Sequence, residues 1–265
     1  MTDLSQPQSD DALDGFDLQQ VHADLLSGAF FVEYLPTISL ADGRMVGAEA
    51  LSRWRRGTEV WQPERFIEVL YRTPMAALLT YRTIDRVNED LRDWLIATPE
   101  LRIGINVPPF VFGRAGIAYA FFRNDLIALA DRFILEVTER GIPDQLGMDA
   151  LNSAAYTGCA VALDDVVLNG ANLAILTRCR LDYIKLSRGL IAEISEQTPR
   201  PDWLPALESL MRAGGLQVIA EGIETPLQAR TLREAGIRLG QGFLYSRPVA
   251  ADTLIDLHRE RFAVW

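Results

Sequence analysis

The sequence has few of the residues that mark several common kinds of site. Its 265 residues include two cysteines, Cys159 and Cys179, without C-x-x-C spacing. This suggests neither a disulfide framework nor a thiolate metal site. The two histidines, His22 and His258, lie near the chain ends, so a metal site in the middle of the chain would have to use oxygen ligands rather than those typical of zinc.

Long apolar runs and an excess of basic residues are also lacking. No uninterrupted apolar run approaches the roughly 18 residues of a membrane span, and the chain start has no basic or apolar region typical of a signal peptide. We therefore expect a cytoplasmic protein without a membrane segment. The formal net charge is −10, which opposes nonspecific binding to DNA and favours a small ligand. A phosphorylated ligand would need bound cations or a local basic pocket.

What is present is an alternation of short β-prone runs and longer helical patterns. Residues 1–17 are polar and acidic and are predicted to be a disordered tail or linker, which leaves 18–265 as one domain. The predicted strands are 30–40, 45–54, 101–107, 133–139, 159–165, 181–187, 216–222 and 238–246. The predicted helices are 74–97, 117–130, 144–157, 202–213 and 225–235. Eight strands with interleaved helices predict an α/β fold, the (β/α)8 TIM-type barrel.

Polar residues lie toward the carboxyl ends of seven of these strands, where the active sites of such barrels are found. They are Glu49 with Arg53, Asn106, Glu136 with Glu139, Asp164 with Asp165, Lys185, Glu221 and Gln241. Alternation along the strand puts apolar neighbours such as Ile103 and Ile105 on the opposite face. The polar set is therefore predicted to point into the barrel.

An inward cluster of carboxylates needs compensation. Its members would be Glu49, Glu136, Asp164, Asp165 and Glu221. Two like charges ~4 Å apart repel by ~4 kcal/mol at an effective dielectric constant near 20, and Lys185 alone cannot neutralise the set. Carboxylate and amide oxygens favour Mg²⁺ or Mn²⁺. Adjacent aspartates also let one carboxylate bridge two ions, as in water attack on phosphodiesters, so the cluster predicts a two-metal hydrolase site.

The motifs resemble those of a known family. AEALSRW, INV, EVTE, LDD, DYIKLS, VIAEGIET and QGFLYSRP stand in the order and approximate spacing of the EAL domain. This bacterial signalling family hydrolyses cyclic di-GMP to linear pGpG. The resemblance spans roughly residues 18–260, and so many motifs in order are far more specific than any single one. It implies a barrel whose first strand, here 30–40, runs antiparallel to the others.

The resemblance also implies metal ligands and catalytic residues. One ion would be bound by Glu49, Asn106, Glu136 and Asp164. Asp164 would bridge to a second ion held by Asp165 and, directly or through water, by Glu221. Lys185 matches the family lysine that contacts the attacking water, whose pKa its charge would help to lower beside the metals.

Further positions match residues that contact substrate or support the site. Arg53 matches a substrate-contacting position, and Gln241 matches one that lines the metal site through water. Glu139 matches the glutamate that anchors the loop after the fifth strand. Glu224 and Arg247 lie beside motif residues, and either could contact substrate or form a surface ion pair. Trp54 and Trp61 are expected to pack rather than to stack on guanine.

Several departures from the family pattern concern the surroundings of the ligands. The family's Y-Q-P-I is here Tyr34, Leu35, Pro36 and Thr37, so an amide near the ligand is replaced by the aliphatic Leu35. The loop D-D-F-G-T-G reads Asp164, Asp165, Val166, Val167, Leu168 and Asn169. K-x-D ends in Ser187, which removes a carboxylate, and N-V-S ends in Pro108. In the family, the D-D-F-G-T-G loop couples the formation of a homodimer to the metal site.

Two classes of function remain open. The first is a cyclic di-GMP phosphodiesterase that uses two Mg²⁺ or Mn²⁺ ions and is slow or needs activation. The second is a catalytically silent EAL module that binds cyclic di-GMP or a protein partner, in which Lys185 could simply neutralise Asp164. The intact acidic cluster favours the enzyme, because a receptor without metals would carry its repulsion without benefit. Leu35, Ser187 and the loop 166–169 favour the silent module.

Overall fold

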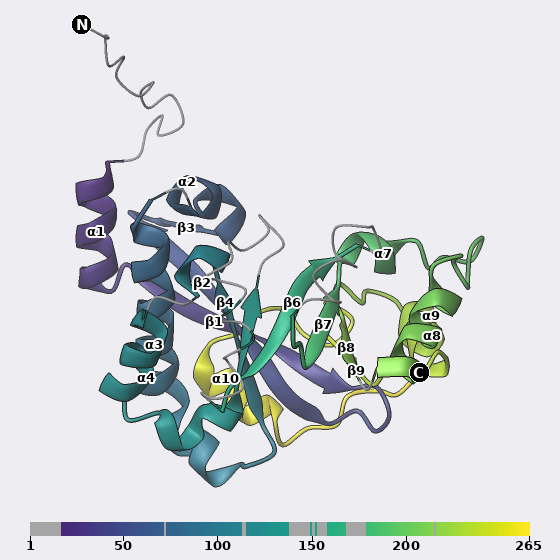
Figure 1. Cartoon of the computed structure of the whole chain (residues 1–265). Helices are drawn as coiled ribbons and strands as arrows, with labels where there is room; N and C mark the ends of the chain where they lie inside the picture. The colour runs from purple at the N-terminus through teal and green to yellow at the C-terminus, as the bar shows by residue number, and fades with distance from the viewer. Residues whose placement is uncertain are drawn as a thin grey trace, which may run out of the picture.

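Eight strands form a closed barrel in the computed structural model (Figure 1). The structure describes residues 17–71, 73–112, 115–137, 149, 152, 158–167, 179–214 and 216–265. The barrel strands are β1 (Phe30–Ser39), β2 (Met45–Arg56), β4 (Arg102–Val107), β5 (Phe133–Val137), β6 (Ala160–Val166), β7 (Tyr183–Leu186), β8 (Gln217–Ala220) and β9 (Leu239–Gly240). The predicted TIM-type barrel is confirmed.

The first strand runs against the rest of the barrel. β1 pairs antiparallel with both β2 and β9, which closes the barrel, whereas the other neighbouring barrel strands pair parallel. This confirms the direction that the family resemblance implies. The last strand is much shorter than predicted, because the chain leaves the sheet at Gln241 instead of continuing to residue 246.

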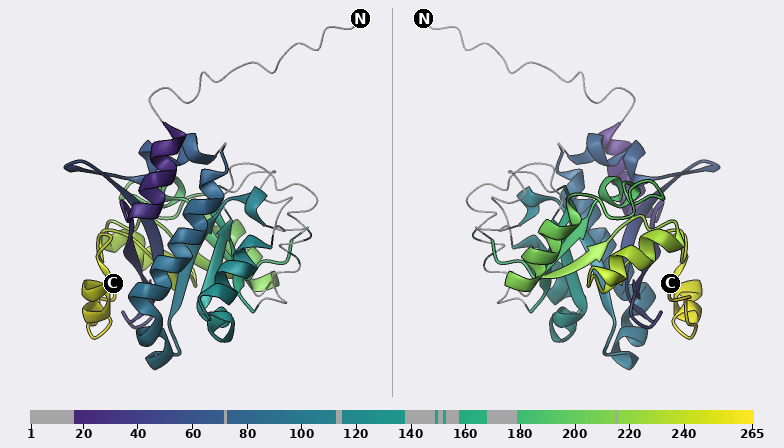
Figure 2. Two further views of the ribbon diagram at one scale, coloured as in Figure 1. Left: turned by 90° about the vertical axis from the view of Figure 1, so that its left-hand side faces the viewer. Right: turned by 90° about the vertical axis from the view of Figure 1, so that its right-hand side faces the viewer.

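A hairpin extends β2 beyond the barrel (Figure 2). Its second strand is β3 (Glu59–Trp61), which was not predicted. Trp54 is buried at the base of this hairpin, where its ring stacks on Phe30 at 4.7 Å and meets Phe66 edge-on. The prediction that Trp54 packs is confirmed.

Helices cover the outside of the barrel. They are α1 (Leu18–Ser27), α2 (Ile67–Tyr71), α3 (Met75–Ala97), α4 (Gly116–Arg123), α7 (Arg188–Ala192), α8 (Leu204–Gly214), α9 (Pro226–Glu234) and α10 (Ala251–Leu257). Short 3-10 helices are η1 (Pro63–Arg65), η2 (Pro109–Val111) and η3 (Ile127–Arg132). No helix in the described part of the chain is long and apolar enough to cross a membrane.

The helix predictions succeed where apolar periodicity is long. Helices α3, α8 and α9 lie close to their predicted ranges, whereas the predicted 117–130 divides into α4 and η3. The predicted helix 144–157 falls almost wholly outside the described residues. Helix α1 was missed, although Asp17 caps it by accepting a hydrogen bond from the backbone N–H of Gln19.

Strand alternation divides the side chains between two environments. On β4, Ile103, Ile105 and Val107 are fully buried in the cluster that lies between the sheet and α3. The intervening Gly104 and Asn106 face the barrel interior, as a period of two requires. The outer faces of the strands therefore pack against the helices, and the inner faces are available to form a functional site.

Candidate functional site

Two layers of side chains face the interior of the barrel. The lower layer is apolar and contains Ile134, Ala162, Tyr183, Ile219 and Leu239. Two residues further along the same strands and their ends stand Glu136, Asp164, Lys185, Glu221 and Gln241. Because alternate residues of a strand share a face, the second layer lies directly above the first. With Glu49 of β2, it forms what we call the acidic layer, which holds four of the five carboxylates predicted to point inward. The prediction was wrong for Asp165, which is exposed.

Lys185 is in the centre of the acidic layer. Its Nζ lies 2.6 Å from Glu221 Oε1, 2.8 Å from Glu136 Oε2, 2.9 Å from Glu49 Oε2 and 3.2 Å from Asp164 Oδ1. An ammonium has three N–H donors and so cannot serve four carboxylates at once. Asp164 Oδ1, which is the most distant, is buried without a hydrogen-bond partner.

Three carboxylates of the layer have raised pKa values, chiefly because they are buried. Burial, together with the charge of Glu49, raises the pKa of Glu136 well above its usual range. Burial also raises the pKa of Asp164, and it raises the pKa of Glu221 to about 8 although Lys185 opposes the change. Additional cations would stabilise the ionised forms of these carboxylates.

The pKa values of Glu49 and Lys185 shift against the direction that burial alone would give. Burial opposes the ionisation of Glu49, but the charge of Lys185 and hydrogen bonds from Lys185 and Asn106 leave its pKa lowered. Burial also favours a neutral Lys185, yet the surrounding carboxylates, Asp164 and Glu136 foremost, raise its pKa well above the usual value. The raised pKa of Lys185 and the lowered pKa of Glu49 therefore favour an ammonium beside an ionised Glu49 carboxylate.

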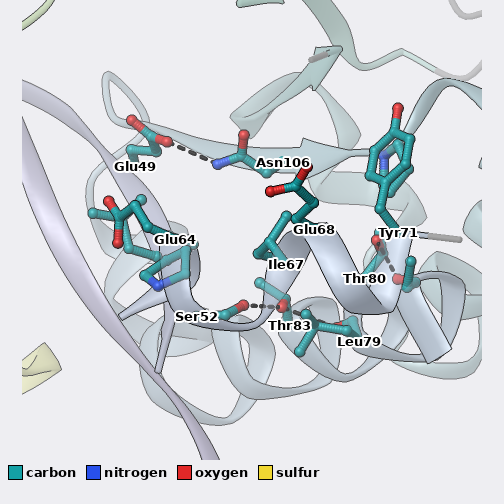
Figure 3. Close-up of a pocket in the computed structure, with 15 residues that line it drawn as sticks. Glu49, Ser52, Glu64, Ile67, Glu68, Tyr71, Leu79, Thr80, Thr83 and Asn106 are labelled. Carbon is teal, nitrogen blue, oxygen red and sulfur yellow. Dashed lines mark hydrogen bonds between the residues drawn. The ribbon is translucent and has the colours of Figure 1, made fainter. Parts of the chain in front are cut away.

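Three carboxylates converge closely enough to share one metal ion. Glu49, Glu136 and Asp164 each offer an oxygen atom, and these atoms all lie within 4.8 Å of one another. Asn106 belongs to the same group, since its Nδ2 donates to Glu49 Oε1 at 2.7 Å (Figure 3). The structure thus brings together the four residues predicted to bind the first ion.

Gly104 makes room for this group. A Cβ atom at position 104 would lie 2.0 Å from Oε1 of Glu136, which is far inside van der Waals contact. Because residue 104 on β4 has no side chain, the carboxylate of Glu136, which comes from β5, can occupy the space beside it. Sequence reasoning did not identify this residue, because a glycine inside a predicted strand gives no indication of its neighbour across the sheet.

Strand β6 has a bulge at the adjacent Asp164 and Asp165. The pairing of β6 with β7 shifts by one residue between Leu163 and Val166, and Asp165 has a φ of 54°. Consecutive residues of a regular strand point to opposite faces, and a bulge changes that direction locally. Asp164 is accordingly in the acidic layer, whereas Asp165 is exposed at the end of the strand.

A cavity of about 320 Å³ lies over the acidic layer. It is lined by Glu49, Asp164, Glu221 and Gln241 from the layer and by three residues that the sequence analysis singled out near the ligand, Leu35, Arg53 and Glu224. Arg53 is buried and donates to Glu33 Oε2 at 2.8 Å and to the carbonyl oxygen of Ser52 at 3.0 Å. The cavity thus combines carboxylates at its base with a fixed guanidinium in its wall.

The rim of this cavity includes a cation that sequence reasoning missed. Arg188 lines it and forms an exposed ion pair with Glu224, with Nη2 2.8 Å from Oε1. The sequence feature that could have identified Arg188 is its position directly after the predicted strand 181–187. Ser187 is buried and caps α7 by accepting from the backbone N–H of Leu190. Glu139, Leu168 and Asn169 lie outside the described residues.

A second cavity of about 300 Å³ adjoins the first beside Glu49 and Asn106 (Figure 3). It lies between β2, α2 and α3, and its apolar lining includes Leu51, Ile67 and Leu79. Ser52 and Thr83 hydrogen bond to one another in its wall at 3.1 Å. Of the acidic layer it shares only Glu49, and its other carboxylates, Glu64 and Glu68, have no lysine beside them among the described lining residues.

Comparison with known proteins identifies the same family. A family model described as the EAL domain matches residues 18–248. The probable cyclic di-GMP phosphodiesterase PdeB of Escherichia coli K12 is 30% identical over 228 residues, which cover 84% of this chain and 43% of PdeB. The cyclic di-GMP phosphodiesterase NbdA of Pseudomonas aeruginosa is 33% identical over 235 residues, covering 86% of this chain and 30% of NbdA. The chain spans less than half the length of both relatives.

Solved structures show the same architecture. The PaMucR phosphodiesterase in complex with c-di-GMP superposes with a TM-score of 0.80 at 26% identity, covering 89% of this chain and 98% of that one. The cAMP-bound EAL enzyme Bd1971 gives a TM-score of 0.82 at 27% identity, covering 93% of this chain and 71% of that one.

Proposed function

Because the chain belongs to the EAL domain family, we propose that it binds cyclic di-GMP and hydrolyses it to linear pGpG. The observation that carries this proposal is the acidic layer, in which three carboxylates and one amide converge beneath a cavity of about 320 Å³. The names of the relatives PdeB and NbdA support the same substrate. The fold alone would not, since one barrel architecture serves many chemistries.

The donor atoms of the layer fit divalent cations. All are oxygens, which suit Mg²⁺ or Mn²⁺, and the buried Asp164 Oδ1 has no hydrogen-bond partner. We propose that Glu49, Asn106, Glu136 and Asp164 hold one ion and that Asp164, Asp165 and Glu221 hold a second. Bound in this way, the ions would lower the pKa of a water molecule and stabilise negative charge on the phosphodiester.

The chain's own cations would then orient the water and the ligand. Lys185 would direct its ammonium at the attacking water, with Glu49 and Glu136 fixing its position through hydrogen bonds of 2.9 and 2.8 Å. Arg53 has two of its three nitrogens bonded to Glu33 and Ser52, which leaves Nη2 without a partner among the described residues. We propose that this nitrogen donates to a phosphate oxygen of cyclic di-GMP.

Two observations favour a catalytically silent receptor. Leu35 lines the same cavity where the family has an amide, and Ser187 is committed to capping α7 where the family has a carboxylate. Binding of cyclic di-GMP without turnover would follow if these two contacts are needed to align the ligand. The acidic layer remains the stronger observation, because a receptor would carry buried repulsion that brings it no affinity.

The test is incubation of the purified protein with cyclic di-GMP and Mn²⁺, followed by chromatography of the nucleotides. Formation of pGpG that disappears in Glu136→Gln supports the enzyme, since this change removes a proposed ligand charge at nearly constant volume. Saturable binding of cyclic di-GMP without pGpG supports the receptor. Absence of both binding and product contradicts both functions.

A further inference from the structure

Gln241 has a fixed backbone but only one hydrogen bond on its side chain. Its N–H donates to the carbonyl oxygen of Ala220 at 2.8 Å, and its carbonyl oxygen accepts from the N–H of Ile223 at 3.0 Å. The side chain is 1% exposed, and its Nε2 donates to Thr37 Oγ1 at 2.9 Å. Its Oε1 is buried without a hydrogen-bond partner.

The unpartnered oxygen belongs to a residue of the proposed active site. Gln241 lines the cavity over the acidic layer together with Asp164 and Glu221. A buried amide oxygen without a partner costs about 1–3 kcal/mol relative to a satisfied one, so its persistence indicates a group that it serves when the site is in use. An acceptor at this place suits a proton of water held among the carboxylates.

From this geometry we propose that Thr37 is a positioning residue, whose hydroxyl fixes the Gln241 carboxamide so that its oxygen is presented to water in the acidic layer. The inference rests on the proposed function and deepens it. Thr37 stands on β1 and is 8% exposed, and it is 204 residues from Gln241 in the chain. The motif that this chain resembles has isoleucine at the matching position, so the hydrogen bond is a feature of this chain's own sequence.

The reason is the symmetry of the amide group. A carboxamide whose oxygen and nitrogen are both unpaired can turn by 180° at little cost and present its NH₂ instead of its oxygen. An NH₂ group facing the layer would direct its positively polarised hydrogens at any cation bound there, which is unfavourable. The Thr37 hydroxyl can accept from Nε2 or donate to Oε1, so it holds the amide in place, and cations in the layer would favour the orientation seen here, with Nε2 toward Thr37. The methyl groups of a valine at this position would leave that end of the amide without a partner.

The test compares Thr37→Val with Thr37→Ser in the full chain. Valine keeps the volume and removes the hydroxyl, whereas serine keeps the hydroxyl. We expect Thr37→Val to raise the Mn²⁺ concentration for half-maximal thermal stabilisation by about fivefold to tenfold, the value of one hydrogen bond. The kcat should fall by a similar factor with little change in KM, and Thr37→Ser should stay within about threefold of the wild type for both.

Two controls separate positioning from packing. Thr231→Val makes the same chemical change at a buried position on α9, away from the site, and should leave the Mn²⁺ midpoint unchanged. In a Gln241→Ala background, Thr37→Val should have no further effect, because the group it positions is gone. Equal losses in Thr37→Val and Thr37→Ser, or additive losses in the double variant, would overturn the proposal.

The outcomes also distinguish this inference from the proposed function. Mn²⁺ binding without formation of pGpG overturns the proposed activity, while the Mn²⁺ midpoints still decide the role of Thr37. No Mn²⁺ binding by the wild type overturns the metal assignment and this inference together. Thr37→Val could also lower the melting temperature of the metal-free protein. In that case the Mn²⁺ midpoints of Thr37→Ser and of the double variant still decide whether Thr37 positions Gln241.

Discussion

Along β5 and β8, the side chains that face the barrel interior change from apolar to ionisable within two residues. Ile134 is followed by Glu136 and Ile219 by Glu221. The two layers share their strands, and most side chains in each are buried. Burial stabilises the first layer by about 25 cal/mol per Å² of apolar surface, whereas it opposes ionisation in the second. The comparison shows where this fold departs from what stability requires, and such departures indicate function.

The largest expected effect comes from Asp164→Asn, which alters the acidic layer without changing its volume. Hydrolysis of cyclic di-GMP should fall at least about 100-fold, because loss of a ligand exceeds the roughly 10- to 100-fold effect of losing an outer partner. The thermal stabilisation by Mn²⁺ should also disappear. Turnover and melting temperature would be measured with and without Mn²⁺, and stabilisation equal to that of the wild type would contradict the bridging role.

Lys185→Met removes the cation that the carboxylates share. The free energy of unfolding of the metal-free protein should fall by about 3–5 kcal/mol near pH 8, as for other broken buried ion pairs. The loss should shrink near pH 5, because Glu136, Asp164 and Glu221 have raised pKa values in the folded state and take up protons as the pH falls. Urea unfolding at both pH values measures this.

The same variant separates two roles of the lysine. If its charge acts on the attacking water, kcat should fall far more than the affinity for cyclic di-GMP, and Mn²⁺ should restore much of the lost stability. A loss confined to ligand affinity would instead identify Lys185 as a ligand clamp. Lys185→Arg serves as the control that keeps the charge while changing its position.

Ile219→Ala makes the corresponding change in the apolar layer. Ile219 is buried beneath Glu221, and its truncation should cost about 2–5 kcal/mol of stability through lost burial and the remaining cavity. The Mn²⁺ concentration for half-maximal stabilisation should change less than threefold. A much larger change would show that the two layers are not independent, and Ile219→Val would then indicate whether volume alone is responsible.

The smallest effect is expected from Glu224→Gln, which removes a charge outside both layers. Its ion pair with Arg188 is exposed, and such pairs contribute about 0–1 kcal/mol. We expect the melting temperature to be nearly unchanged. Binding of cyclic di-GMP, followed by calorimetry, tests the alternative that Glu224 contacts substrate, since a surface ion pair would leave the affinity within about threefold.

The sequence predicts the members of the acidic layer better than their contacts. Alternation and the strand-end position are local properties, so Asn106, Glu136 and Asp164 could be placed on an inner face from their neighbours alone. Strand direction is not local, and the antiparallel β1 followed only from the family resemblance. The Lys185 contact to Glu49 joins residues 136 apart in the chain, and no local pattern could have given its distance.

Gly104 shows how such a site can be lost without any change to its chemistry. One added methyl group there would collide with the Glu136 carboxylate and push it out of the layer, while every acidic motif in the sequence stayed intact. Surveys that sort these domains into competent and degenerate members by their charged residues would classify such a variant wrongly. In this chain the residue between Ile103 and Ile105 is therefore as informative as any carboxylate, and we expect Gly104→Ala to disturb the site by shape alone.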